Sequence, residues 1–188
     1  MLSRFNLAPL FRAHWKGLTN GITSPTPDWP SRLILMFVPV IVGVFSALFG
    51  WRLMAPGALL AGVTLLAGSL LSAFTHLSSL RMKISEWTEE NSDRFNVERA
   101  MLDETAAHLL LASLASIVNA VIIVIGLNFH SGVKEEIDGF WAAVSLAFSS
   151  WTVMLFVLCL PRLYSAYVEI NHVEENLSGF TRRRGRSK

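Results

Sequence analysis

Four long apolar stretches constrain this chain more than any other feature of its sequence. Each is long enough to cross the hydrocarbon core of a bilayer, which takes about 17 to 25 helical residues, and none has Asp, Glu, Lys or Arg in its interior. Lipid offers no hydrogen-bond partner to an open backbone, so each stretch is predicted to be a helix. The predicted spans are residues 33–50, 53–76, 107–127 and 140–160.

The composition also indicates a membrane protein. Only 16% of the 188 residues are charged, whereas a soluble domain carries about 25%. The chain has one cysteine, Cys159, which excludes an intrachain disulfide. The predicted fold class is therefore all-α: a polytopic membrane protein of four transmembrane helices, arranged as two hairpins, with helical extensions that form a small cytoplasmic bundle.

The distribution of cations along the chain predicts its topology. Of the 16 Lys and Arg residues, 14 lie before residue 33, between residues 81 and 99 or after residue 161. Positive charge accumulates in cytoplasmic segments, so both termini and the loop between the second and third spans are expected in the cytoplasm. The expected location is the inner (plasma) membrane of a bacterium. A mitochondrial inner membrane is the alternative, because no acidic residue precedes Asp28 in the Arg-bearing amphipathic start.

The sequence divides into four parts. Residues 1–31 form a cytoplasmic or interfacial segment, in which an amphipathic helix is expected to lie flat among the lipid headgroups. Residues 32–161 form the transmembrane domain, which includes a cytoplasmic helical hairpin at residues 77–106. Residues 162–179 are predicted to form a cytoplasmic helix, and residues 180–188 a basic tail.

Small and hydroxyl-bearing residues recur at helical spacing inside the spans, where such residues let helices approach closely. The residues predicted to pack helices together are Gly57, Ala61, Thr64, Gly68, Ser72, Ser116, Asn119, Ser145 and Ser149. Asn119 places a carboxamide in an otherwise apolar run. An interhelical hydrogen bond is the favoured interpretation, and a contact to a ligand or an ion is the alternative.

An apolar period continues beyond the predicted spans. Its members are expected to form the core of the cytoplasmic bundle or a docking surface for a soluble protein partner: Leu80, Ile84, Trp87, Phe95, Ile170 and Val173. The tail arginines are expected to bind anionic lipid headgroups, at about 1 kcal/mol each. They are Arg182, Arg183, Arg184 and Arg186. Nucleic-acid binding is disfavoured because the chain has no recognition motif.

The sequence contains no motif of a known reaction centre. No carboxylate lies inside a predicted span, which disfavours transport driven by protons or cations. Zinc-protease, nucleophile-elbow and phosphate-loop motifs are lacking. His76 and His108 are expected at similar depth on adjacent helices, with Glu104 one turn from His108. This loose cluster alone does not predict a metal site, and no catalytic or cofactor-binding residue is predicted.

Three functional hypotheses follow. The first is a non-enzymatic integral membrane protein, a dimer to tetramer, that anchors or signals to a cytoplasmic protein through its projecting helices, in bacterial phage defence or stress response. The second is an oligomeric pore or a membrane-perturbing effector. The third is a lipid-modifying enzyme at the membrane surface, for which His76, His108 and Glu104 are the candidate residues.

Overall fold

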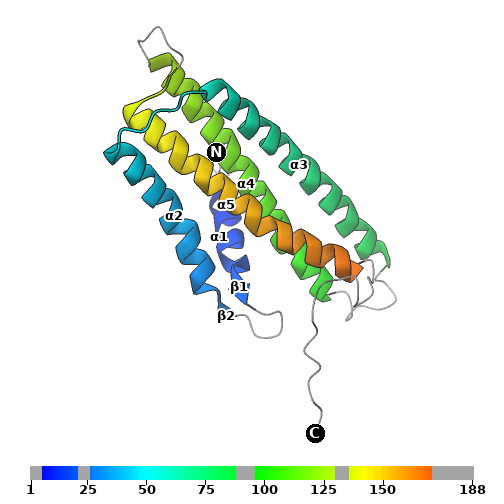
Figure 1. The fold of residues 1–188 in the computed structure, drawn as a ribbon. Helices are drawn as coiled ribbons and strands as arrows, with labels where there is room; N and C mark the ends of the chain where they lie inside the picture. The colour runs from blue at the N-terminus through cyan, green and yellow to red at the C-terminus, as the bar shows by residue number, and fades with distance from the viewer. Residues whose placement is uncertain (1–5, 21–25, 88–95, 130–135, 171–188) are drawn as a thin grey trace.

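A computed structural model describes residues 6–20, 26–87, 96–129 and 136–170 (Figure 1). These ranges contain the helices α1 (Ala8–Gly17), α2 (Trp29–Leu48), α3 (Pro56–Trp87), α4 (Asn96–Phe129) and α5 (Gly139–Ile170). Two short strands, β1 (Thr19–Asn20) and β2 (Thr26–Pro27), form an antiparallel pair with Thr19 opposite Pro27. This pairing turns the chain from α1 into α2.

Four of these helices are long and apolar enough to cross a membrane. The apolar parts are Trp29–Leu48, Pro56–Lys83, Leu102–Phe129 and Gly139–Pro161. Each contains most of one predicted stretch, so the structure confirms the helical fold and four candidate membrane spans. The spans differ from the predicted ones at their ends, where local contacts set the boundary.

The first span begins at Trp29 rather than at residue 33, because Asp28 caps the helix. The Asp28 carboxylate accepts hydrogen bonds from the Ser31 backbone N–H at 3.4 Å and from the Ser31 hydroxyl at 2.6 Å. Such a cap satisfies a backbone donor that the first helical turn leaves open. The helix ends at Leu48, two residues before Gly50, whose φ of 60° is a left-handed conformation that favours glycine.

The second span begins at Pro56 rather than at residue 53, because Leu53 pairs with another loop. The Leu53 N–H donates to the Ile137 carbonyl at 2.8 Å, and the Ile137 N–H donates back at 3.1 Å. Proline at the first position of a helix gives up no hydrogen bond, so α3 starts there. The bridge ties the α2–α3 connection to the segment that leads into α5.

The helices pack in the order α3, α4, α5, α2, and α1 packs against α4 (Figure 1). The larger buried cluster contains Leu70 of α3, Leu109 of α4 and Leu155 of α5. A second cluster, around Ile123 and Ile137, lies near the Leu53–Ile137 bridge. Because α4 touches α3, α5 and α1, it is the central helix of the fold.

Three helices extend past their apolar parts at one end of the bundle. At this end, which we call the basal end, α2 and α4 begin and α3 and α5 terminate (Figure 1). The Arg81 side chain of α3 lies 3.1 Å from the Asp103 carboxylate of α4. Leu163, two residues beyond the apolar part of α5, still packs against the main cluster. These contacts join α3 to α4, and α5 to the main cluster, close to where the extensions begin.

Candidate functional site

The first helix is short and amphipathic, as its sequence predicts. The Asn6 side chain accepts a hydrogen bond from the Ala8 N–H at 3.0 Å, and Pro9 lies in the first turn, where proline is tolerated. The side of α1 that carries His14 is buried against α4, whereas Leu7, Phe11 and Trp15 are exposed. The expected position of this helix among the lipid headgroups stays a prediction.

A pair of histidines forms the contact between α1 and α4. The His14 and His108 rings lie 4.5 Å apart, centroid to centroid, and both side chains are buried. The backbone carbonyl of Glu104 lies 2.8 Å from Nδ1 of His108. Gly17 packs closely against α4, because a Cβ added there would lie 2.6 Å from the Glu104 Cγ atom and 2.9 Å from the His108 ring.

The basal end of α1 is also tied to α2. The Arg32 guanidinium donates a hydrogen bond to the Trp15 carbonyl at 2.8 Å, and its central carbon lies 5.3 Å from the centroid of the Trp15 ring. An arginine in this position attracts the aromatic face. The Asp28 N–H donates to the Leu18 carbonyl at 3.0 Å. These contacts hold the basal part of α1 beside α2, and a gap lies farther along α1.

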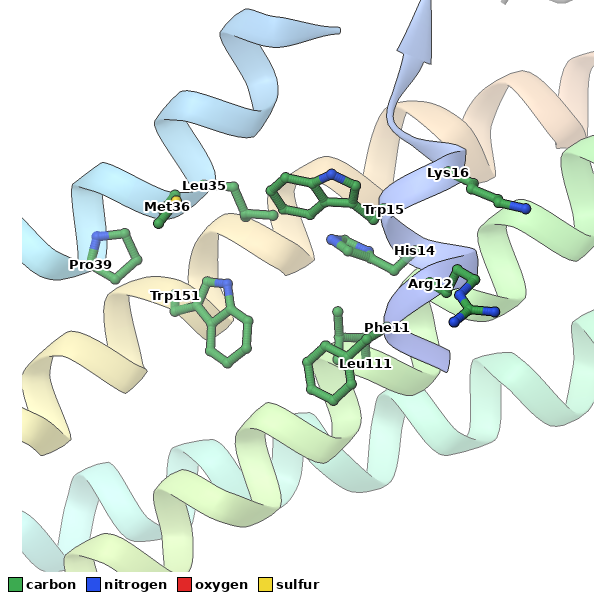
Figure 2. Close-up of a pocket in the computed structure, with 10 residues that line it drawn as sticks. All are labelled: Phe11, Arg12, His14, Trp15, Lys16, Leu35, Met36, Pro39, Leu111 and Trp151. Carbon is green, nitrogen blue, oxygen red and sulfur yellow. The ribbon is translucent and has the colours of Figure 1, made fainter. Parts of the chain in front are cut away.

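That gap is a cavity of about 790 Å³ between α1, α2, α4 and α5 (Figure 2). Its walls are mainly apolar, and they include Phe11, Trp15, Pro39, Leu111 and Trp151. Pro39 is the eleventh residue of the 20-residue α2, and Trp151 is the thirteenth of the 23-residue apolar part of α5. The cavity therefore reaches the middle of two candidate spans.

Two cations of α1 also border the cavity. Arg12 and Lys16 are one helical turn apart, and both are exposed. In Figure 2 their side chains extend from a different side of α1 than Trp15 and Phe11. Among the residues that the structure describes, no carboxylate lies within ion-pair distance of either cation.

The predicted packing residues of α4 and α5 lie between these two helices. The Asn119 amide donates to the Ser149 hydroxyl at 2.9 Å, and that hydroxyl donates to the Ser145 carbonyl at 2.7 Å. Ser116 donates to the Ala112 carbonyl of its own helix. Asn119, Ser116 and Ser145 are fully buried, so Asn119 makes the kind of interhelical contact that a packing role requires.

The predicted packing residues of α3 have a different environment. Gly57, Ala61, Thr64, Gly68 and Ser72 are all exposed, on the side of α3 away from α4. A Cβ added at Gly57 or Gly68 would have no neighbour within 4 Å. Their packing against another chain stays a prediction, because they pack against no described part of this one.

Most of the predicted partner surface lies outside what the structure describes. Leu80 is 40% exposed on α3. Ile84, Trp87 and Ile170 lie within helices α3 and α5, but their side chains are not described. Phe95, Val173 and the four tail arginines, Arg182, Arg183, Arg184 and Arg186, lie outside the described residues.

The histidine pair differs from the one that sequence spacing suggests. His76 is exposed on α3, and the partner of His108 is His14. A sequence signal for His14 exists, since residues 7, 10, 14 and 17 fall on one face of a helix. Within the described residues, no group of three or more His, Cys, Asp or Glu side chains is arranged to hold a metal ion.

No protein-family model, curated protein or solved structure matches this chain. Functional inference therefore rests on the geometry alone. That geometry offers an exposed face of small residues on α3, three helix ends that extend past their apolar parts, and an apolar cavity beside α1.

Proposed function

We propose that this chain is a non-enzymatic integral membrane protein that self-associates through α3 and engages a soluble partner through the basal ends of its helices. The single observation that carries the proposal is the outward position of the small-residue face of α3. In lipid, helices associate by close approach through Gly, Ala, Ser and Thr, because lipid is as apolar as leucine and gives little hydrophobic drive.

The two sides of α3 support this role. Its buried residues, Val63, Ala67, Leu70 and Leu77, face α4. The opposite side, which carries Ala61, Thr64, Gly68, Ser72 and Thr75, is exposed. The exposed hydroxyls of Thr64 and Thr75 donate to carbonyls of their own helix. Those hydroxyls are satisfied without a partner, so a neighbouring helix can pack on this face at no polar cost.

The basal ends supply the surface for a soluble partner. The α5 helix continues nine residues past the apolar part, from Pro161 to Ile170, which is about 14 Å at 1.5 Å per residue. The α4 helix begins at Asn96, six residues before its own apolar part. The ion pair between Arg81 and Asp103 and the packing of Leu163 support a small bundle rather than three separate ends.

The charge distribution supports a cytoplasmic position for the basal end. Arg81, Lys83 and Arg99 lie on α3 and α4 close to it, whereas Arg52 lies at the opposite end. By the positive-inside rule the basal end then faces the cytoplasm of a bacterium, or the matrix in a mitochondrial inner membrane. A role in phage defence or stress response, beside a soluble companion, belongs to the same proposal.

A matched pair of glycines tests self-association. Gly68 lies on the exposed small-residue face of α3, and Gly62 lies on the same helix about 120° away. A Cβ at either position meets no neighbour within 4 Å. Gly68→Leu is expected to convert the oligomer to monomer in mild detergent, and Gly62→Leu is expected to leave it intact. Equal oligomer sizes for both variants, measured by light scattering, would refute the proposal.

The partner surface needs its own experiment. The full chain, carrying an affinity tag and expressed in its native host, is expected to retain a soluble protein through solubilisation. Shortening the chain after Pro161 removes the α5 extension, and retention of that protein is then expected to fall. Retention of the same protein by the shortened chain would remove the support for this part of the proposal.

An oligomeric pore is the second candidate, and one observation favours it. The exposed side of α3 carries the hydroxyls of Thr64, Ser72, Thr75 and Ser79, which would line a water path if several copies met there. Liposomes that contain the oligomer would then leak ions, and Gly68→Leu would seal them. Liposomes that stay sealed with the intact oligomer leave the scaffold as the remaining function.

A further inference from the structure

The cavity beside α1 is large enough for a ligand and has walls suited to hydrocarbon. Its volume of about 790 Å³ falls within the range of about 300 to 1,000 Å³ that is usual for small-molecule sites. Phe11, Leu111 and Trp151 supply apolar walls from three helices. An ordered water needs two to four polar partners, and these walls offer few.

The depth of the cavity along the candidate spans indicates which apolar molecule would occupy it. Pro39 and Trp151 lie midway along candidate membrane spans. The residues on the neighbouring face of α2, Met36 and Val40, are more than half exposed. A cavity at this depth opens toward lipid chains rather than toward bulk water, so a membrane lipid is the occupant that reaches it most directly.

The two cations of α1 favour a lipid with an anionic headgroup. Arg12 and Lys16 border the cavity, one turn apart, and no described carboxylate pairs with either. An arginine beside a membrane-spanning region is costly unless an anion or water satisfies it. The two long side chains extend from a different side of α1 in Figure 2, and they reach a phosphate at the rim of the cavity by turning toward it. The attached chain then passes along Phe11 and Trp15 into the cavity.

We propose that this cavity binds one anionic phospholipid of the surrounding membrane, with an acyl chain between Phe11 and Trp151 and the phosphate on Arg12 and Lys16. This proposal is distinct from the expected binding of headgroups by the tail arginines, which requires no cavity. It is also independent of self-association, because α3 contributes no residue to the cavity.

Native mass spectrometry of the purified full chain tests the proposal. Phosphatidylglycerol and phosphatidylcholine with identical acyl chains are the probes. One phosphatidylglycerol is expected to stay bound at concentrations where phosphatidylcholine is lost. Since each cation near a lipid surface contributes about 1 kcal/mol, the double variant Arg12→Gln/Lys16→Gln is expected to bind phosphatidylglycerol about 30-fold more weakly.

Two further variants separate a real site from loosely held lipid. Lys83→Gln/Arg52→Gln removes two exposed cations remote from the cavity and is expected to bind as the parent chain does. Met36→Trp enlarges a residue that lines the cavity and is 62% exposed, so it narrows the path of an acyl chain without opening the core. It is expected to lose the bound lipid while keeping the helix content and oligomer size of the parent.

Equal retention of the two lipids by the parent chain would overturn the proposal. Unchanged retention of phosphatidylglycerol in Met36→Trp, or an equal loss in both charge variants, would overturn it as well. These outcomes do not depend on α3, so they leave the proposed self-association to its own test.

Discussion

The interface between α4 and α5 and the outer face of α3 carry the same kinds of residue in opposite environments. Both have Ala, Ser, Thr or Asn at steps of three and four. In the most apolar stretch of α4, 50% of the residues are buried, whereas in that of α3 only 17% are buried. The small residues between α4 and α5 lie at a contact between two helices, and those on the outer face of α3 are exposed. Spacing therefore identifies a packing face but does not identify its partner.

The contrast has a physical cause in the arrangement of the helices. α4 touches three other helices, whereas α3 packs mainly against α4. A helix with one neighbour can bury only one side, and α3 buries the side that carries Leu70 and Leu77. Its small residues lie on the other side, where close approach is possible only with another molecule.

The largest expected effect comes from enlarging a small residue in the buried region. Ala142 of α5 is fully buried in the cluster with Ile123 and Ile137. Overpacking a well-packed core costs about 1 to 3 kcal/mol, so Ala142→Leu is expected to lower the unfolding free energy by that amount. Equilibrium unfolding in mixed detergent micelles measures it.

Ala61→Leu is the matched control on α3, since Ala61 is exposed. It is expected to leave the unfolding free energy of the monomer within about 0.5 kcal/mol of the parent, while it weakens association. If both substitutions destabilised the monomer equally, the distinction between the two regions would be lost.

A smaller but sharp effect is expected where α1 meets α4. A methyl group at Gly17 would lie 2.6 Å from the Glu104 Cγ atom and 2.9 Å from the His108 ring. Gly17→Ala is therefore expected to push α1 away and cost about 1 kcal/mol or more. Gly57→Ala, which meets open space, is expected to be neutral or slightly stabilising because alanine favours helix. Thermal unfolding in the same micelles compares them, and equal midpoints would contradict the close fit of α1.

Much of the architecture follows from sequence, because a membrane span depends on the composition of about 20 consecutive residues rather than on single positions. The four apolar runs lie in α2, α3, α4 and α5. Their ends depend on single contacts that hydropathy does not register. The Asp28 cap starts α2 earlier than predicted, and the Leu53–Ile137 bridge delays α3.

A smaller effect on stability is expected from the hydrogen bond between Asn119 and Ser149. Its amide donates to Ser149, while its carbonyl oxygen has no partner among the described residues. Asn119→Leu removes a favourable hydrogen bond and an unfavourable buried oxygen together. The change in unfolding free energy of this single variant is therefore smaller than the contribution of the hydrogen bond. A double-mutant cycle with Ser149→Ala is expected to give a coupling energy of about 0.6 kcal/mol. A coupling energy of zero would mean that the bond does not stabilise the fold.

The smallest effect is expected at the basal end. Arg81 and Asp103 are exposed enough, at 36% and 61% of their side chains, for water and salt to screen the pair. A double-mutant cycle of Arg81→Gln and Asp103→Asn is expected to give about 0.2 to 1 kcal/mol, falling as salt is added. A coupling that is large and independent of salt would show instead that this region is buried by something the single chain lacks.

The candidate site is less predictable from sequence than the fold. His14 and Gly17 share a helix face with Leu7 and Leu10, but nothing in that pattern says that the face meets His108. The cavity is harder still, because its walls come from four helices that are far apart in the sequence. The hydrogen bond that ties α1 to α2, from Arg32 to the Trp15 carbonyl, joins residues 17 positions apart.

Disulfide cross-linking within native membranes tests the outward face of α3 most directly. In a Cys159→Ala background, Gly68→Cys and Gly62→Cys place single thiols on α3 where a side chain meets no neighbour of its own chain. Treatment with a membrane-permeable oxidant is expected to give covalent dimers with Gly68→Cys and few with Gly62→Cys. Equal cross-linking at the two positions, or none at Gly68→Cys, would contradict the account.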